Sequence, residues 1–577
     1  MHLIDLIKEE AESALRAALG ETPVDLDFAA AFVYPEDFIN GDLSFPCFQL
    51  AKSLKTAPPK IAADLAAKLA LPAIFTKVEA TGPYLNFFLA AEELITGTVA
   101  AALEAGESYG RSTSDQPEKL MVEYISPNNN KPLHIGHIRN GLLGESICGL
   151  LASQGHQIIR ALLLNDRGLP IAKSMVTYRR WGEGSTPESS GLKGDHFVAK
   201  WYVRYSQEEK KGTPGLEEEA HEIIRQWEAN EPETRKLWQT MNDWCEAGQH
   251  ETYRKLGVHF DVEYKESDIY LHGKEIVEEG LRRGVFEKDA TGAVVARLEK
   301  YGLPDKVVLR SDGTSLYITQ DLYLAKKRVE EHGLDGLTYI VGNEQNLQFQ
   351  QLFKIFELLG YPWASKLTHL SYGYVNLLGG RIKSREGTVA DADDLVSALE
   401  TDAALEIKQR HVTITDDEMI RRAHQVAMAA VKFYFLEVDI TTDMNYDPRA
   451  SLAFTGKTGP YLQYMHARIK SIIRHAGGEP PSPAYQGRQQ VSEEKSLALL
   501  IAKWPEVVRD AAESFRPSLV AQHLYAVAKS FAAFYENAQV LNASPEDRAV
   551  RLSIIAAAAL VLKNGLALIG IEAPEEM

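Results

Sequence analysis

The stretch Ser126–His137, with the sequence SPNNNKPLHIGH, decides the fold of the region around it. An apolar run that ends at Ile125 precedes the stretch, and a run with helical periodicity follows it from Ile138. This order predicts a strand, a tight polar turn and the beginning of a helix. Two histidines, His134 and His137, stand at the mouth of that helix.

The beginning of this helix is suited to binding phosphate. Its first turn has free backbone N–H groups and a partial positive charge, which attract anions. Gly136 lets a nucleotide approach without a Cβ atom in the way. His134 and His137 share one helix face and can donate hydrogen bonds to phosphate oxygens whose charge grows in a transition state. A solvated polar loop explains a bare H-x-G-H equally well, so the residues around it must decide.

Composition places the chain among ordinary soluble proteins of several domains. Its 577 residues are 45% hydrophobic and 25% charged, enough for about three or four domains. No run of uninterrupted apolar residues reaches the length of a membrane span, and the acidic first residues do not resemble a signal peptide. We therefore expect a cytoplasmic protein with no membrane partner.

Charge and cysteine usage exclude several classes of function. The net charge of −18 argues against a protein that coats nucleic acid indiscriminately, and no DNA partner is expected, although local basic patches could still bind a specific RNA. Cys47, Cys148 and Cys245 are scattered, which predicts neither a disulfide framework nor a cysteine zinc site. His221 and His250 each begin an H-E-x-x motif that lacks its second histidine, so no resident metal is expected.

Periodicity divides the chain into three parts. Residues 1–112 look like a small α/β domain, with helices over Ile4–Leu19 and Ile61–Leu71. Residues 113–400 begin with a strand–helix–strand unit, which predicts a parallel sheet, and we interpret the charged helical stretch at about 181–265 as an insertion. Residues 401–577 are almost wholly helical. The strands expected in the first part are Ala30–Val33, Ile74–Val78 and Tyr84–Leu89.

The quoted stretch resembles the ATP-binding signature of class I aminoacyl-tRNA synthetases, in the form used by arginyl-tRNA synthetases. That family has a Ser-Pro-Asn start, a lysine, and H-x-G-H followed by Arg-Asn or Arg-Ser; here Arg139 and Asn140 follow. The resemblance covers essentially the whole chain. It implies a multidomain α/β and all-α protein: a Rossmann-like parallel-sheet catalytic domain with an inserted helical region, a small α/β N-terminal domain and a C-terminal helical bundle.

A second basic segment, Gly379–Thr388, resembles the K-M-S-K-S loop of the same class. Mobile glycines and three cations suit a flap over a triphosphate. Arg381 stands at the first lysine of that motif and Ser384 at the second, usually catalytic, lysine. In arginyl enzymes without that lysine, the lysine upstream of H-x-G-H is thought to substitute, which here is Lys131. The resemblance thus implies catalytic roles for Lys131, His134, His137, Lys383 and Arg385, and ATP contacts from His134, Gly136, His137, Arg381, Lys383 and Ser384.

The segment Asp312–Asp321 is the candidate amino-acid pocket. Tyr317 and Asp321 are four residues apart, so a helix that begins there presents both on one face. A guanidinium needs such partners, a carboxylate for its planar fork and an aromatic plane to lie against. The family resemblance implies an arginine site, to which Glu123, at the end of the first strand, adds a further carboxylate. The expected substrate-binding residues are Glu123, Ser126, Asn128, His137, Tyr317, Asp321 and Gln345.

The segment Gly459–Ile469 opens a long helix that carries aromatic and cationic side chains. Flat side chains can stack on bases and cations can meet phosphates, although the same aromatics could simply pack the helix start. The segment resembles the start of the family's anticodon-binding domain, and Gly82–Phe88 resembles the extra domain that touches the tRNA elbow. The candidate tRNA contacts are Tyr461, Gln463, Tyr464 and Arg468.

The resemblance implies the ATP-dependent attachment of L-arginine to tRNA through an arginyl-adenylate, with Mg²⁺ arriving with ATP, in a cytoplasmic monomer. Two alternatives stay open from the residues. One is a different ATP-dependent transferase with H-x-G-H, such as a nucleotidyltransferase or another class I synthetase. The other is a synthetase-derived RNA-binding protein without catalysis, which would have no need of Lys131, His134 and His137.

Overall fold

The computed structural model describes residues 2–20, 22–35, 38–114, 116–314, 316–378, 390–410, 414–478, 485 and 491–577. The chain forms two compact units. We call residues 113–452 and 515–518 the central unit, and residues 1–112, 453–514 and 519–577 the terminal unit.

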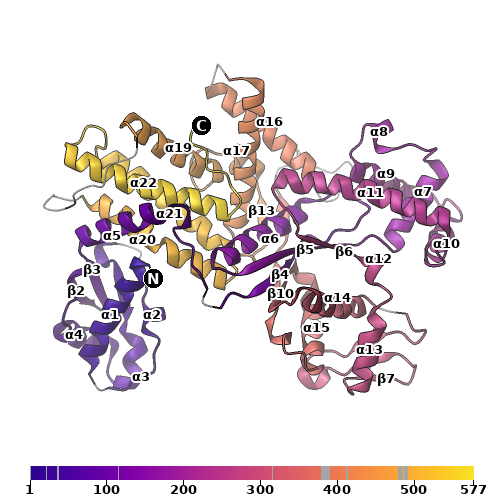
Figure 1. Cartoon of the computed structure of the whole chain (residues 1–577), viewed down its shortest axis with the longest axis horizontal. Helices are drawn as coiled ribbons and strands as arrows, with labels where there is room; N and C mark the ends of the chain where they lie inside the picture. The colour runs from indigo at the N-terminus through magenta and orange to yellow at the C-terminus, as the bar shows by residue number, and fades with distance from the viewer. Residues whose placement is uncertain are drawn as a thin grey trace. The chain divides into compact units, whose positions relative to one another are not determined.

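A parallel sheet forms the centre of the central unit (Figure 1), in the order β11-β10-β4-β5-β6. Its apolar strands are covered by helices, as parallel sheets require. The chain runs from β4 outward to β5 and β6, and β10 then returns to the other side of β4, so the topological switch point lies between β4 and β10. Ligands bind at the carboxyl ends of the strands at such a point. The strands are β4 Lys119–Glu123, β5 Gln157–Leu164, β6 Val262–Lys265, β10 Gly336–Gly342 and β11 Leu367–Tyr372.

The expected Rossmann-like sheet is therefore confirmed. Two helices connect the strands on either side of its switch point. Helix α6 (Ile135–Ser153) joins β4 to β5, and α14 (Tyr317–His332) leads into β10. The remaining elements of this unit are α12 Glu266–Ile269, α13 Gly273–Arg282, β7 Phe286–Lys288, β8 Val294–Ala296, β9 Lys306–Leu309, α15 Asn346–Leu358, β12 Val375–Leu377, α16 Ala392–Arg410, α17 Asp416–Leu436, β13 Met444–Tyr446 and α18 Pro448–Ser451.

A helical region is inserted between β5 and β6, as expected (Figure 1). It packs around its own aromatic core, which includes Phe197, Trp201 and Trp227. Its helices run from Leu169 to Leu256, whereas Val262–Lys265, expected inside the insertion, pairs with β5 as the edge strand. These helices are α7 Leu169–Trp181, α8 Pro187–Ser190, α9 Gly194–Lys210, α10 Leu216–Glu228 and α11 Pro232–Leu256.

The first 112 residues of the terminal unit form a small α/β body. Its antiparallel sheet has the order β1-β3-β2. The expected strand over Ala30–Val33 is wrong: Phe28–Ala31 is a helical turn, α2, capped by Asp27, and only Val33 makes a bridge, to Ser44. A local cap outweighs the apolar run there. The main elements are α1 Leu3–Leu19, β1 Leu43–Pro46, α4 Pro58–Lys68, β2 Phe75–Thr81, β3 Tyr84–Leu89 and α5 Ala91–Ala105.

The carboxy-terminal part of the terminal unit is helical, as expected. Helix α22 is the only one in the described part of the chain that is long and apolar enough to cross a membrane, and 67% of its apolar window is buried as a core helix. Helix α17 belongs to the central unit, although the sequence analysis assigned residues after 400 to the C-terminal domain; the three-domain division stays a prediction. The long helices here are α19 Gly459–His475, α20 Ser492–Glu513, α21 Pro517–Asn537 and α22 Pro545–Leu568.

Candidate active site

Strand β4 ends in a strained turn that opens the site. Ile125 and Ser126 both have positive φ, 67° and 42°. Such backbone is rare for side chains other than glycine, and rarest for β-branched ones, and it clusters at functional sites. The Nδ2 amide of Asn165 donates to the carbonyl oxygen of Ser126 (3.0 Å), and Asn165 also forms a parallel bridge with Asn128, so β5 supports the turn.

The two histidines form a hydrogen-bonded cap on α6. Their rings stack with centroids 3.8 Å apart. The Nδ1 atom of His134 accepts from the Gly136 N–H and the Nδ1 atom of His137 accepts from the His134 N–H, both at 3.1 Å. With Nδ1 as acceptor, each neutral ring carries its proton on Nε2 as a free donor. A Cβ atom on Gly136 would lie 3.1 Å from the His134 ring, so glycine also makes room for the stack.

Burial keeps both rings neutral. It lowers the pKa of His134 to about 4, and the charge of Lys131 lowers it further. Burial, then His134, then Lys131 lower the pKa of His137 well below its ordinary value. The pKa of Lys131 is itself lowered by burial, and among the described residues no carboxylate lies within ion-pair distance of its ammonium. A half-buried cation beside two N–H donors at a helix start is an arrangement that attracts phosphate.

The inserted helix α11 fixes the backbone of the turn. The Nε2 amide of Gln249 donates to the carbonyl oxygens of Asn128 (3.2 Å) and Lys131 (3.0 Å). The side chain of Asn129 donates to Asn242 Oδ1 at 2.7 Å. The turn that carries Lys131 is therefore held by the insertion as well as by the sheet.

Two buried residues of α6 have structural roles that the sequence analysis did not assign. Arg139 is fully buried and donates to backbone carbonyl oxygens just before β12 and β13, among them Gly373 (2.6 Å) and Thr442 (2.9 Å). Asn140 accepts from the Ile125 N–H (2.7 Å) and donates to the Ile340 carbonyl (2.9 Å), so it joins the ends of β4 and β10. The only sequence signal was their place directly after H-x-G-H.

Helix α14 begins at Tyr317, as the spacing required, and presents the candidate pocket residues. Tyr317 is 73% exposed, and Asp321, one turn later, is half-buried and accepts from Gln348 Nε2 at 2.8 Å. Burial, and next the charge of Glu123, raise the pKa of Asp321 to about 7, although the Gln348 hydrogen bond opposes the rise. Gln345 is exposed and lies just after β10, at the carboxyl edge of the sheet.

Glu123 has a protein partner that the sequence analysis missed. It is buried at the end of β4 and is ion-paired with Arg328 of α14, whose side chain is fully buried; the Ser126 hydroxyl donates to the other carboxylate oxygen at 3.1 Å. The Arg328 guanidinium also lies over the Tyr264 ring at 4.7 Å. Of the two carboxylates Glu123 and Asp321, only Glu123 is bonded to a cationic side chain in the described part of the chain. The spacing of seven residues from Asp321 to Arg328, two helical turns, was the available signal.

The predicted basic-loop residues Arg381, Lys383, Ser384 and Arg385 lie outside the described residues. The chain that follows them returns to the site. The Ile135 N–H donates to the Ala390 carbonyl and the Ala392 N–H to the Leu133 carbonyl, both at 3.0 Å, so residues 390–392 pair with the backbone on either side of His134.

The candidate tRNA contacts lie on α19, but not all of them reach the surface. Tyr464 is exposed, Tyr461 and Arg468 are half-buried, and the Arg468 guanidinium lies over the Tyr535 ring at 4.5 Å. Gln463 is fully buried and donates to the Glu572 carbonyl (2.9 Å), which ties α19 to the carboxy-terminal tail. The position of Gln463 is that of a structural contact.

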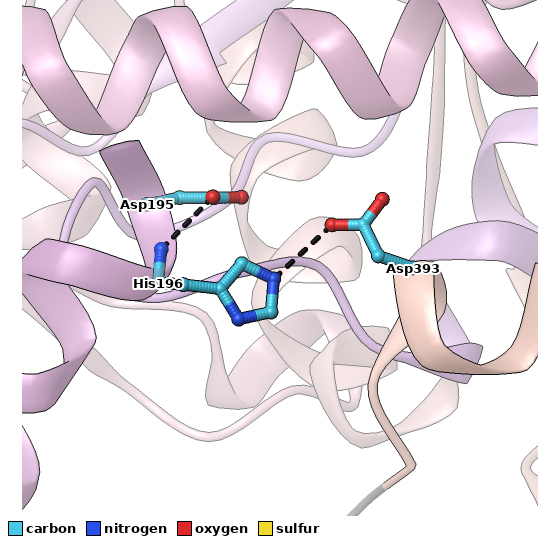
Figure 2. A group of neighbouring side chains, drawn as sticks. All are labelled: Asp195, His196 and Asp393. Atoms are coloured by element: carbon cyan, nitrogen blue, oxygen red, sulfur yellow. Dashed lines mark hydrogen bonds and ion pairs between the residues drawn. The ribbon is translucent and has the colours of Figure 1, made fainter. Parts of the chain in front are cut away.

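A cluster of possible metal ligands lies beside α16. Asp195, His196 and Asp393 bring ligand atoms within 4.8 Å of one another (Figure 2). The Lys193 ammonium already occupies this cluster, 3.0 Å from Asp195 Oδ2 and 2.6 Å from Asp393 Oδ2. Because a cation with three donors sits on the oxygens that a metal would need, the residues do not fit a metal site.

Three family models match successive parts of the chain. Residues 98–447 match tRNA synthetases class I (R), catalytic domain. Residues 5–89 match the arginyl tRNA synthetase N terminal domain, and residues 462–577 match the DALR anticodon binding domain. Together these matches include H-x-G-H, helix α14 with its candidate pocket residues, and α19 from residue 462 onward.

Similar proteins extend the match over the whole length. An arginine–tRNA ligase of Treponema denticola is 40% identical over 93% of both chains, and one of Porphyromonas gingivalis is 36% identical over 100% of both. The solved arginyl-tRNA synthetase of Thermus thermophilus has a TM-score of 0.84 and 27% identity, and covers 99% of this chain and 100% of its own. The chain belongs to the arginyl-tRNA synthetase family.

Proposed function

We propose that the chain attaches L-arginine to its tRNA in two steps. The arginine carboxylate attacks the α-phosphate of ATP, which forms arginyl-adenylate and releases pyrophosphate. A hydroxyl of the 3′-terminal ribose of tRNA then attacks the activated carbonyl carbon and releases AMP. One observation carries the proposal: a lysine ammonium with no ion-paired carboxylate among the described residues lies beside two N–H donors, at the same sheet edge as the α14 carboxylate Asp321, to which no described cationic side chain is bonded. No covalent enzyme intermediate is needed.

On the ATP side, the chain supplies positioning and charge. His134 and His137 donate from Nε2 to phosphate oxygens, Gly136 leaves space at the helix start, and Lys131 neutralises the departing pyrophosphate. Mg²⁺ arrives with ATP and is held mainly by its phosphates, since this ion needs few protein ligands. Lys383 and Arg385 assist Lys131, with Arg381 and Ser384 as further ATP contacts from the basic loop.

On the arginine side, Asp321 accepts the guanidinium fork and Tyr317 offers its exposed ring as a stacking surface. Gln345, Ser126, Asn128 and His137 complete the substrate contacts. Glu123 acts indirectly, by its charge and by holding Ser126, because its carboxylate is already bonded to Arg328 and Ser126. A lysine substrate would leave part of this arrangement unpaired, which favours arginine.

For tRNA, residues 1–112 touch the elbow and residues 401–577 bind the anticodon region, with Tyr461, Tyr464 and Arg468 as contacts. Bound tRNA is required before the adenylate forms. The protein works as a cytoplasmic monomer.

The test is arginine-dependent ATP–pyrophosphate exchange, with and without tRNA, on the wild type and on Lys131→Ala. We expect exchange only with tRNA, and its loss in the variant. Full activity of the variant would show that Lys383 or Arg385, and not Lys131, neutralises the phosphate. Exchange with another amino acid would support a different class I enzyme, and tight tRNA binding without any exchange would support a non-catalytic RNA-binding protein.

A further inference from the structure

A closed network of charged and polar side chains joins the helical insertion to the beginning of α16. Beyond its two carboxylate partners, the Lys193 ammonium contacts the Thr252 hydroxyl of α11 at 2.5 Å. Thr252 in turn donates to Asp393 Oδ1 at 3.1 Å. The His196 ring points toward Asp393, with Nε2 3.2 Å from Oδ2 (Figure 2). Asp393 therefore receives contacts from three side chains of the insertion.

Helices α9 and α11 of the insertion pack closely beside this network. A Cβ atom on Gly194 would lie 1.9 Å from the Trp244 carbonyl oxygen, and one on Gly248 would lie 2.5 Å from the Asp195 backbone nitrogen. Two glycines thus allow α9 and α11 to touch, which buries Asp195 fully beside Lys193. A buried carboxylate needs such a partner.

The network is one residue away from the backbone that holds H-x-G-H. Asp391 caps α16 by accepting from the N–H groups of Asp393 (2.9 Å) and Asp394 (3.2 Å). Residues 390–392 pair with the backbone of Leu133 and Ile135, as described above. A displacement of Asp393 would move this paired segment, and with it the backbone on either side of His134.

The same inserted helix also holds the other side of the site. Three residues before Thr252, Gln249 of α11 donates to the carbonyl oxygens of Asn128 and Lys131. Helix α11 therefore contacts the turn that carries Lys131 directly, and reaches the segment beside His134 through Asp393. Both contacts thus hold the backbone that carries Lys131 and His134.

We propose that Lys193 is a positioning residue for adenylate formation: by holding Asp393 against α9 and α11, it keeps residues 390–392 paired with the start of α6 and so aligns His134 with Lys131. This inference rests on the proposed function. It gives the helical insertion a role in the first chemical step, although none of its side chains needs to touch ATP.

The experiment measures ATP–pyrophosphate exchange in the presence of tRNA, and thermal unfolding, for the wild type, Lys193→Met, Lys193→Arg and Asp393→Asn. Lys193→Met leaves buried Asp195 without its cation and could fail to fold; Asp393→Asn keeps the Lys193–Asp195 pair and can still accept from Thr252. We expect kcat/KM for ATP to fall about 10- to 100-fold in Asp393→Asn, as small misplacements of catalytic groups do. KM for arginine should stay unchanged, and Lys193→Arg should restore most of the activity of Lys193→Met.

Lys255→Met is the matched control. Lys255 pairs with Glu400 at 3.1 Å, so this ion pair also joins α11 to α16, two turns beyond Asp393. The Lys255→Met substitution should leave kcat/KM for ATP near the wild-type value. If Asp393→Asn and Lys255→Met behave alike, or if the Asp393→Asn loss lies in KM for arginine, the proposal is overturned. A wild type that shows no arginine-dependent exchange in the presence of tRNA would instead contradict the proposed function, so the two failures are distinguishable.

Discussion

At the scale of single residues, two neighbouring carboxylates differ in how their charge is compensated. Glu123 is bonded to the buried guanidinium of Arg328. Asp321 has only the neutral Gln348 amide as a hydrogen-bond partner in the described part of the chain, and burial raises its pKa to about 7. Of the two carboxylates, only Glu123 is therefore bonded to a cationic side chain in the described part of the chain, a difference that residue type alone could not reveal.

The ionisation of Asp321 should appear in the pH dependence of arginine use. Only the carboxylate form pairs with a guanidinium, so kcat/KM for arginine should rise by about tenfold per pH unit below about pH 7 and level off above it. Because the native pKa lies above the ordinary 3.8, this group's contribution to stability without ligand should fall as pH rises from 3.8 toward 7. In Asp321→Asn the inflection should vanish and kcat/KM should drop by roughly 10- to 100-fold. An unchanged pH profile in that variant would refute the assignment.

Removal of the cation from the Glu123–Arg328 pair should be costly. Arg328→Met leaves Glu123 buried and charged without its partner, which should lower the free energy of unfolding by about 3–5 kcal/mol. The double variant Glu123→Gln/Arg328→Met removes both charges and should recover much of that loss. Urea unfolding measures both values, and equal destabilisation of the single and double variants would show that lost packing, not the unpaired charge, dominates.

At the scale of one element, the N-terminus of α6 uses the same side chains for two purposes. The Nδ1 atom of His134 caps the helix, and its Nε2–H remains free for a ligand. Periodicity predicted this helix from Ile138, whereas the structure begins it at Ile135. The difference arises because a histidine is an unusual cap, and its stack with His137 is visible only in three dimensions.

Capping and catalysis at His134 can be separated by substitution. Asn can accept from the Gly136 N–H as His134 does but lacks the Nε2 donor, so His134→Asn should lower the exchange rate by about 10²- to 10³-fold with little loss of stability. His134→Ala should lose the cap as well, at a further cost of about 1 kcal/mol of stability. Exchange rates and thermal unfolding of both variants check this. Wild-type exchange in His134→Asn would show that the donor plays no part.

At the scale of the whole molecule, the two ends of the chain fold together. Residues 1–112 and the carboxy-terminal helices form one compact unit, although the central unit separates them in sequence. Trp504 of α20 is fully buried and its indole N–H donates to the Tyr109 carbonyl at 3.0 Å. A Cβ atom on Gly110 would lie 2.2 Å from that indole nitrogen, so glycine is required where the chain passes the ring.

Trp504→Ala should therefore weaken both ends of the chain at once. The loss of a buried indole should cost about 3–5 kcal/mol of stability. Hydrogen exchange should become faster together in α1 and α20, while β4 and α6 of the central unit keep their protection. Loss of protection confined to α20 would contradict the cooperative terminal unit.

The sequence alone determined the local features of this protein. Periodicity located β3 with its observed bounds, because buried strands and their turns leave short-range signals. The family motifs pointed to H-x-G-H, Lys131 and the Tyr317–Asp321 face, because this chemistry needs particular residues at fixed spacing. The roles of these residues, including those of the basic loop, stay predictions.

Only the tertiary structure decided which distant residues compensate one another. Arg328 neutralises Glu123 across 205 positions of sequence, Gln249 holds the Lys131 turn from an inserted helix, and Gln463 is turned into the core instead of toward solvent. Such pairings follow from how helices pack on the sheet, and the local sequence indicates at most which face of a helix a residue lies on. The physical reason is that burial and long-range contact set the charge state and orientation of a side chain, whereas sequence sets only its type and its place on an element.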